Sequence, residues 1–235
     1  MNGSFDADKK NRKGSVLTID KESRFFAADT ELISAGKYNL IIGLMIACGF
    51  ALNLAMAYFM PGLILSLPPV AIIIAYFVLA IGGVAIVHRS SSAFVSGIAF
   101  FVLAAGTGLV LTYILSGYTG ASVVLAFAIT AVITVVMAVI SSIFPAVFLS
   151  MGRGLLVSLG VTIVAELICM FFFRGALGAF DYVVILIFCG YIGFDWARAQ
   201  LYQKTVRNAI ASAADLYVDI VNILIRILSI VGKGR

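Results

Sequence analysis

Charge is what this sequence has least of. Of its 235 residues 11% are charged and 63% are hydrophobic, whereas a typical soluble domain has about 25% charged residues. So large a shortage over a chain this long excludes an ordinary soluble domain and predicts a polytopic membrane protein. Between Tyr38 and Trp196 the charged residues are Arg89, Arg153, Glu166, Arg174, Asp181 and Asp195.

Motifs for catalysis and for tight metal binding are also missing. The three cysteines lie inside apolar runs at no metal-ligand spacing, and the single histidine, His88, lies in a predicted loop. No HExxH, GxSxG or P-loop sequence occurs. The net charge of +5 comes from the tail and the loops, which on a membrane protein report orientation. We therefore expect no catalytic residue, no cofactor and no nucleic-acid partner.

Long apolar runs fill most of the chain. A spanning helix needs about 20 mostly apolar residues, and seven runs meet that requirement. They lie near 38–60, 69–88, 93–116, 120–142, 152–173, 180–199 and 208–231. The predicted fold is an all-α polytopic membrane protein, with a polar cytoplasmic tail (1–37) and a seven-helix transmembrane domain (38–235).

The distribution of basic residues predicts the orientation. With seven spans, the tail and the more basic links fall on one side, which the positive-inside rule places in the cytoplasm. The N-terminus is then cytoplasmic, and no apolar segment with a cleavage site precedes the first span, so we expect no cleavable signal peptide. Span seven carries several charges, and a re-entrant segment that returns to the cytoplasm stays an alternative for it.

The polar residues of span seven form one stripe. Asp215 and Asp219 are four residues apart and so share a helix face, which Asn222 and Arg226 continue. A charged group near the bilayer centre costs about 2.5–3.5 kcal/mol, so such a stripe should face the interior of the bundle. The alternative is an amphipathic helix lying on the membrane surface. Two acids against one base argue against it, because surface helices are usually basic.

Two further acids lie within predicted spans. Asp195 closes span six and is followed by Trp196 and Arg198, which is how a span commonly ends, so taken alone it is a flanking residue. Glu166 in span five needs a basic partner, for which Arg226 or Arg174 is available. We expect a structural intramembrane ion pair there.

Spans six and seven form a predicted hairpin that brings carboxylates together. If the turn is centred on position 207, Asp195 lies at the same height as Asp219. If the turn is centred on position 205, Asp195 lies at the same height as Asp215. No glycine or proline lies between Phe194 and Val231 to fix the turn, so spacing leaves both open. Two adjacent carboxylates cannot both ionise cheaply, so such a pair would share a proton and act as a proton-gated latch. Deprotonated, it would offer oxygen ligands to a hard cation such as Ca²⁺.

Four segments in the second half of the chain carry a family resemblance. They are YTGASVVLAFAITAVITVVMAVIS (118–141), LSMGRGLLVSLGVTI (149–163), GYIGFDWARAQ (190–200) and DLYVDIVNILIRIL (215–228). In this order they resemble the Bax inhibitor-1, or transmembrane BAX inhibitor motif, family, and the short tail suggests a bacterial-type member in a plasma membrane.

The resemblance implies both a fold and a site. It implies seven transmembrane helices with the seventh enclosed by the other six, and a pH-sensitive Ca²⁺ leak controlled by aspartates on helices six and seven. The matching segments put this pair on Asp195, in FDWARAQ, and Asp219, in YVD. It also implies an arginine on helix two as their counter-charge, for which Arg89 is the candidate, although Arg89 serves equally well as a loop anchor. Asp215 departs from the family pattern, which more usually has an uncharged residue at this position. It is a candidate for an additional cation ligand or for a third charge beside the pair.

Three functions from different classes are compatible with these features. The first is a leak that is permeable to Ca²⁺, bound transiently by Asp195 and Asp219, and sensitive to protons. The second is a non-conducting regulator in the bilayer whose partner is a membrane-bound AAA protease or another membrane protein. Family members of that kind tend to lack the aspartate pair. The third is an intramembrane aspartyl protease, but the required Gly-x-Gly-Asp turn is absent at both aspartates.

Overall fold

The structure, a computed structural model, describes residues 31–172 and 177–232, without the side chains of residues 166, 167, 169–172, 177 and 179. Every element in the described ranges is a helix, so the all-α prediction is confirmed there. The long helices are α2 (Ala35–Phe59), α4 (Pro69–Arg89), α5 (Ala93–Leu115), α6 (Gly120–Ile143), α8 (Gly152–Phe172), α9 (Leu177–Leu201) and α10 (Val206–Val231). Two short helices, α3 (Pro61–Leu65) and α7 (Pro145–Ser150), occupy segments that we expected to be plain links.

Local sequence explains where the helices begin. The side chains of Ser34, Thr119 and Thr205 cap α2, α6 and α10, each accepting a hydrogen bond from a backbone N–H three residues on. Proline stands in the first turn of α3, α4 and α7, where its missing N–H costs nothing. Helix α2 begins three residues before the predicted span.

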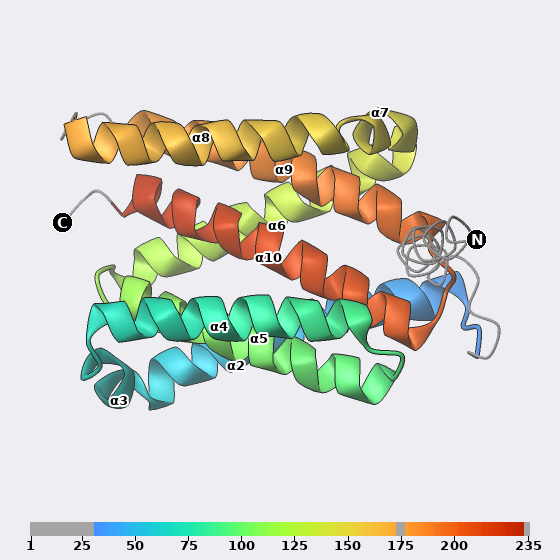
Figure 1. Ribbon diagram of the computed structural model, residues 1–235, viewed down its shortest axis with the longest axis horizontal. Coiled ribbons are helices and arrows are strands. Elements are labelled where there is room, and N and C mark those ends of the chain that lie inside the picture. Colours follow the sequence, from blue (N-terminus) through green and yellow to red (C-terminus); the bar gives the residue numbers. More distant parts are fainter. Residues whose placement is uncertain (1–30, 173–176, 233–235) are drawn as a thin grey trace, which may run out of the picture.

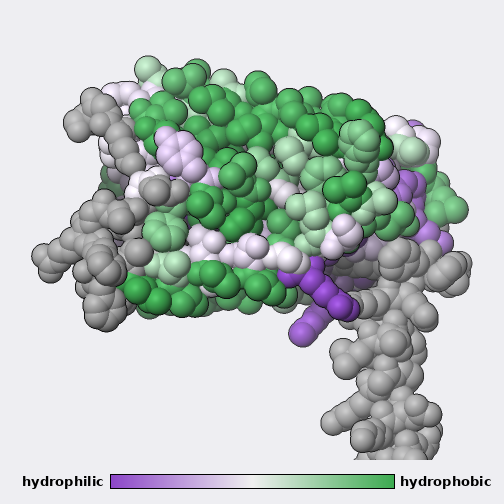
Figure 2. Space-filling view, turned by 90° about the horizontal axis from the view of Figure 1, so that it is seen from above, coloured by the Kyte–Doolittle hydropathy of each residue, from purple (hydrophilic) through white to green (hydrophobic). Residues whose placement is uncertain are grey.

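The bundle is an integral membrane architecture. By length and composition, α2, α4, α5, α6 and the part of α9 from Phe180 to Leu201 are apolar enough to cross a membrane. In α8 the described apolar stretch is shorter, Gly152–Ala165, and the four charged residues of α10 set that helix apart. The count of seven spans therefore stays a prediction. Figure 2 shows one face that is mostly hydrophobic, with hydrophilic residues gathered toward one end.

Helix α10 runs through the middle of the bundle (Figure 1). In that view α8 and α9 lie on one side of it, and α2, α4 and α5 on the other. It packs against α2, α4, α5, α6 and α9, and most of its residues are buried, including Tyr217 and Asp219 on nearly opposite faces. The alternative of a helix lying on the membrane surface is therefore wrong, because both the polar and the apolar face of α10 have protein neighbours.

Small residues and internal hydrogen bonds hold the helices together. Gly83 lets α4 approach α5 closely: a Cβ there would lie 2.9 Å from the Ala99 carbonyl oxygen. The buried Tyr217 hydroxyl shares a 2.7 Å hydrogen bond with Thr107 on α5, and Asn53 on α2 donates another to it. Such contacts are needed in a bilayer, where apolar surface alone gives little drive for helices to associate.

Candidate functional site: a carboxylate cluster on α9 and α10

Described basic side chains gather where α2 and α10 begin and α4 and α9 end, which we call the basic end. They are Lys37, His88, Arg89, Arg198, Lys204 and Arg207. The buried hydroxyl of Tyr38 ties three helices together there, since it donates to the Ala199 carbonyl (3.1 Å) and bonds the Ser212 hydroxyl (3.0 Å). Three aspartates, Asp195, Asp215 and Asp219, lie next to these hydrogen bonds, on the side toward the middle of the bundle.

The structure brings Asp195 of α9 and Asp219 of α10 into contact. Their carboxyl groups lie within hydrogen-bonding reach of each other, and the two residues are only 9% and 5% exposed. Two carboxyl groups can hydrogen-bond to each other only when one of them carries a proton. The pair implied by the family resemblance is therefore placed so that it can share one.

Asp215 joins the same cluster through two basic residues. One of its oxygens lies 2.7 Å from His88 Nε2, and the other is 2.8 Å from the Arg198 guanidinium. Arg198 also contacts Asp195 at 2.8 Å, one turn away on α9. Arg198 thus bridges Asp195 and Asp215. The spacing of the sequence suggested that Asp195 meets either Asp215 or Asp219, whereas in the structure both lie in one cluster with it.

The cluster has more acid than base. Three carboxylates face Arg198, which is always charged, and His88, which is charged only when protonated. Two of its atoms, Asp219 Oδ2 and Arg198 Nε, are buried without a hydrogen-bond partner. A buried polar atom without a partner is costly. Asp219 Oδ2 can still bind a proton or contact a cation, and the Arg198 Nε–H can still donate to a water molecule.

The chain direction explains why Asp219 meets Asp195. The link between the helices is short, with α9 ending at Leu201 and α10 beginning at Val206 under the Thr205 cap, so the turn comes earlier than either centre that we considered. Side chains on a helix tilt toward its N-terminus. On α9 this tilt carries the Asp195 carboxylate away from the turn, and on α10 it carries the Asp219 carboxylate toward the turn. Both displacements favour the more distant Asp219.

Several residues do not lie where the sequence suggested. Arg89 is exposed and forms no ion pair with the three carboxylates, so the geometry gives the counter-charge to Arg198. His88 lies in the last turn of α4 rather than in a loop. Arg198 points into the cluster instead of anchoring a helix end, and Asp195 is a buried partner rather than a flank. Sequence offered one signal for Arg198, its position three residues after Asp195.

A second charged pair lies toward the other end of α10. Arg226 contacts Asp181 of α9 at 3.0 Å, and the Ser229 hydroxyl donates to the same carboxylate at 2.8 Å. Arg226 is thus in an intramembrane ion pair, with a partner that the sequence had not indicated. The expected partners lie outside the described part of the chain, which lacks the side chain of Glu166 and the whole of Arg174.

A cavity of about 370 Å³ lies where α8, α9 and α10 meet. Its α10 wall carries Asp219, Asn222 and Arg226, so the polar stripe expected on span seven faces this space. The rest of the lining comes from apolar and aromatic residues, among them Val184, Phe188 and Tyr191 of α9. The cavity leads from the carboxylate pair toward the Asp181–Arg226 pair.

No group of three or more described His, Cys, Asp or Glu residues is arranged to hold a metal ion. Ca²⁺ takes six to eight oxygen ligands, roughly three times what two monodentate carboxylates supply. A cation between Asp195 and Asp219 would keep much of its water. This donor set fits transient contact with a passing ion rather than a resident metal.

A family model described as inhibitor of apoptosis-promoting Bax1 matches residues 37–235. The chain belongs to the Bax inhibitor-1 family. The resemblance carried by the four segments is thereby confirmed, and the match reaches back to the start of α2.

The curated relatives of this family member include a protein of Borreliella burgdorferi described as an uncharacterized protein. The two are 27% identical over 145 residues, which is 58% of this chain and 62% of that relative. The chain therefore spans less than two thirds of the relative's length.

Proposed function

We propose that this Bax inhibitor-1 family member is a pH-sensitive, Ca²⁺-permeable leak of the bacterial plasma membrane, with Asp195 and Asp219 as its gate. The observation that carries the proposal is the close approach of these two buried carboxyl groups on neighbouring helices. All seven long helices would cross the bilayer with α10 enclosed by the others, and the basic end would face the cytoplasm.

The shared proton holds the gate closed. Arg198 stabilises the negative charge of Asp195, so the proton belongs on Asp219, which donates to Asp195. When this proton leaves, two negative charges face each other in a buried site, which repels the two helices and attracts a cation. Flux is therefore expected to rise with pH.

Further support comes from the surroundings of the pair. The cavity next to Asp219 gives an ion a partly polar route along α10, and Arg198 with Asp215 lies between the pair and the rest of the basic end. The proposal assigns no catalytic residue, because neither aspartate stands in the Gly-x-Gly-Asp turn of intramembrane aspartyl proteases.

The test is Ca²⁺ entry into proteoliposomes that enclose a Ca²⁺ indicator, followed from mildly acidic to mildly basic pH. We expect the wild-type flux to rise with pH, and the pH response to be lost or displaced in Asp195→Asn and Asp219→Asn. Asp181→Asn is the matched control, since Asp181 is an equally buried aspartate of α9 outside the pair. It should keep the pH response.

Two outcomes would contradict the proposal. Unaltered flux in both pair variants would remove the gate from Asp195 and Asp219. No flux at any pH, from protein shown to be folded, would instead favour the non-conducting regulator that binds a membrane-bound AAA protease.

A further inference from the structure

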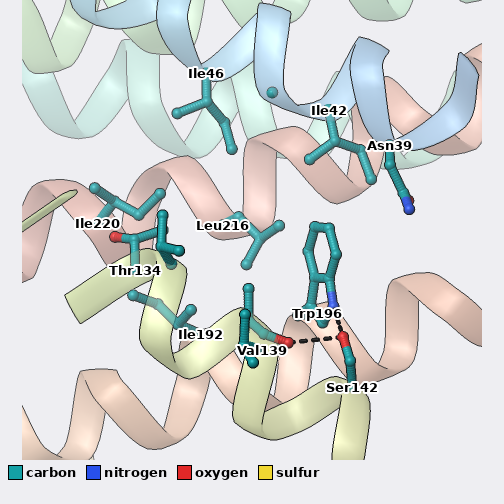
Figure 3. Close-up of a pocket in the computed structure, with 13 residues that line it drawn as sticks. Asn39, Ile42, Ile46, Thr134, Val139, Ser142, Ile192, Trp196, Leu216 and Ile220 are labelled. Carbon is teal, nitrogen blue, oxygen red and sulfur yellow. Dashed lines mark hydrogen bonds between the residues drawn. The ribbon is translucent and has the colours of Figure 1, made fainter. Parts of the chain in front are cut away.

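A second cavity, of about 360 Å³, opens on the side of the bundle between α2 and α6, away from the polar stripe of α10 (Figure 3). Helices α9 and α10 form its floor. The residues that define its shape are Ile42, Ile46, Val139, Ile192, Leu216 and Ile220. The lining is almost entirely apolar, which is ordinary for a ligand pocket of this size and unsuited to an ion or a polar solute.

The mouth of the cavity faces the bilayer. Val135 and Val139 of α6 line it and are 63% and 53% exposed, and Gly43 on the α2 rim is exposed as well. Both helices are long and apolar enough to span a membrane. The medium outside this opening is therefore lipid hydrocarbon rather than water.

The two ends of the cavity differ. One to two turns beyond it, Phe50 of α2 meets Phe127 of α6 edge to face at 5.6 Å, which brings the helices together. At the basic end the cavity is bounded by Trp196, Ser142 and Asn39 (Figure 3). An indole beside polar groups is typical of the level where hydrocarbon gives way to lipid headgroups.

The indole and hydroxyl groups of the lining and the Asn39 side-chain oxygen are already engaged within the protein. Trp196 Nε1 donates to the Ser142 hydroxyl at 2.8 Å, and this hydroxyl donates to the Ala138 carbonyl at 2.7 Å. The Asn39 side-chain oxygen accepts from Gln200 at 3.1 Å. A ligand in the body of the cavity thus contacts hydrocarbon groups and does not need to form hydrogen bonds with the protein.

We propose that this cavity binds one acyl chain of a phospholipid from the leaflet at the basic end. The chain enters between α2 and α6 and lies on Leu216 and Ile220, and its headgroup stays at the level of Asn39 and the exposed Lys37. An acyl chain matches the apolar walls, and the bilayer supplies it at the mouth. A void left empty would forfeit dispersion contacts on every wall. The proposal stands whether or not the protein conducts Ca²⁺.

Trp196 reports directly on occupancy, because it is the only tryptophan of the chain and it lines the cavity. The full-length protein in detergent micelles is titrated with phosphatidylcholine that carries bromine on its acyl chain, which quenches indole fluorescence on contact. We expect quenching that saturates near one lipid per protein and is reversed by unbrominated phosphatidylcholine. Bromine near the carbonyl end should quench more than bromine at the chain terminus, since Trp196 lies at the headgroup end.

Two matched variants locate the site. Ala138→Phe puts a ring into the cavity and should abolish most of the saturable quenching, whereas Val132→Phe puts the same ring on the lipid-exposed side of α6, outside the lining, and should leave it intact. Helical circular dichroism shows whether each variant is folded. If Ala138→Phe fails to fold, saturation of the quenching near one lipid per protein in the wild type still decides.

Three results would overturn the proposal. One is quenching that only follows the bromolipid share of the micelle, as for any lipid-facing indole. Another is equal quenching in the two phenylalanine variants. The third is a dimer in which Trp196 is not quenched by bromolipid, which would indicate that a helix of a second copy occupies the cavity.

Discussion

The two charged sites along α10 are built on opposite principles. Toward the basic end, Asp195, Asp215 and Asp219 face Arg198 and a histidine, so acid exceeds permanent base. Toward the other end, Asp181 meets Arg226 and a serine hydroxyl, one acid for one base. Both sites lie between α9 and α10, and the α9 aspartate of each is largely buried. Their difference lies in charge balance rather than in burial.

Charge balance decides how each site responds to its surroundings. A buried pair of one acid and one base is neutral as it stands, and it needs no proton or ion from outside. A site with surplus carboxylates must take up a proton or a cation to approach neutrality. The first is suited to hold two helices together, and the second to sense pH. Four experiments can break or sharpen this contrast.

The largest effect is expected from Arg198→Gln, which removes the permanent positive charge of the cluster. At pH 8 the variant should lose about 2–3 kcal/mol of unfolding free energy, less than a fully buried pair would, because the Arg198 side chain is 33% exposed. At pH 5 the Asp195–Asp219 pair takes up protons and the loss should shrink. Thermal unfolding in detergent at both pH values measures this, and an equal loss at both would contradict the surplus of acid.

Exchanging aspartate for asparagine should have opposite signs at the two sites. Asp181→Asn leaves Arg226 with a weaker partner and should cost about 1–2 kcal/mol. Asp219→Asn should be neutral, or stabilising by up to about 1 kcal/mol at pH 8, because the amide still donates to Asp195 and cannot ionise. Unfolding midpoints of the two variants at pH 8 provide the comparison. A loss of similar size in both would mean that Asp219 acts as an ordinary ion-pair partner.

His88→Gln tests the adjustable base of the cluster. His88 Nε2 lies 2.7 Å from Asp215, a contact that is an ion pair only when the histidine is protonated. We expect the variant to lose roughly 0.5–1 kcal/mol of unfolding free energy, since glutamine keeps a hydrogen bond but cannot carry the charge. The same unfolding assay measures it, and an unchanged midpoint is the contrary result.

The smallest effect is expected from Arg89→Gln. Arg89 is the neighbour of His88 and was the counter-charge that the family resemblance suggested, but it is exposed and outside the cluster. Its removal should change the unfolding free energy by no more than about 0.5 kcal/mol and should leave the pH response of Ca²⁺ flux intact. If the pH dependence of Ca²⁺ flux shifts as far as in the Asp195 variant, Arg89 is the counter-charge after all.

Much of the fold was readable in the sequence because a bilayer constrains sequence strongly. Runs of apolar residues predicted all seven long helices, and capping residues and prolines account for where several of them begin. The short helices α3 and α7 were missed, since proline signals an interruption but does not specify the structure after it. The polar stripe on α10 was predicted from its spacing, and the structure turns that stripe toward the cavity beside α8 and α9.

The sequence by itself determined the class of protein, its family, and the helices that carry Asp195 and Asp219, because these rest on hydropathy, helical period and motif order. Tertiary structure decided which side chains meet. It placed Asp215 in contact with His88, which is more than a hundred residues away in the sequence, and directed Arg198 toward the carboxylates. It also paired Arg226 with Asp181 and formed the lipid-facing cavity that Trp196 lines. The physical reason is that spacing along one helix fixes only the face on which a side chain lies. The partner across that face depends on how neighbouring helices pack, which no local pattern records.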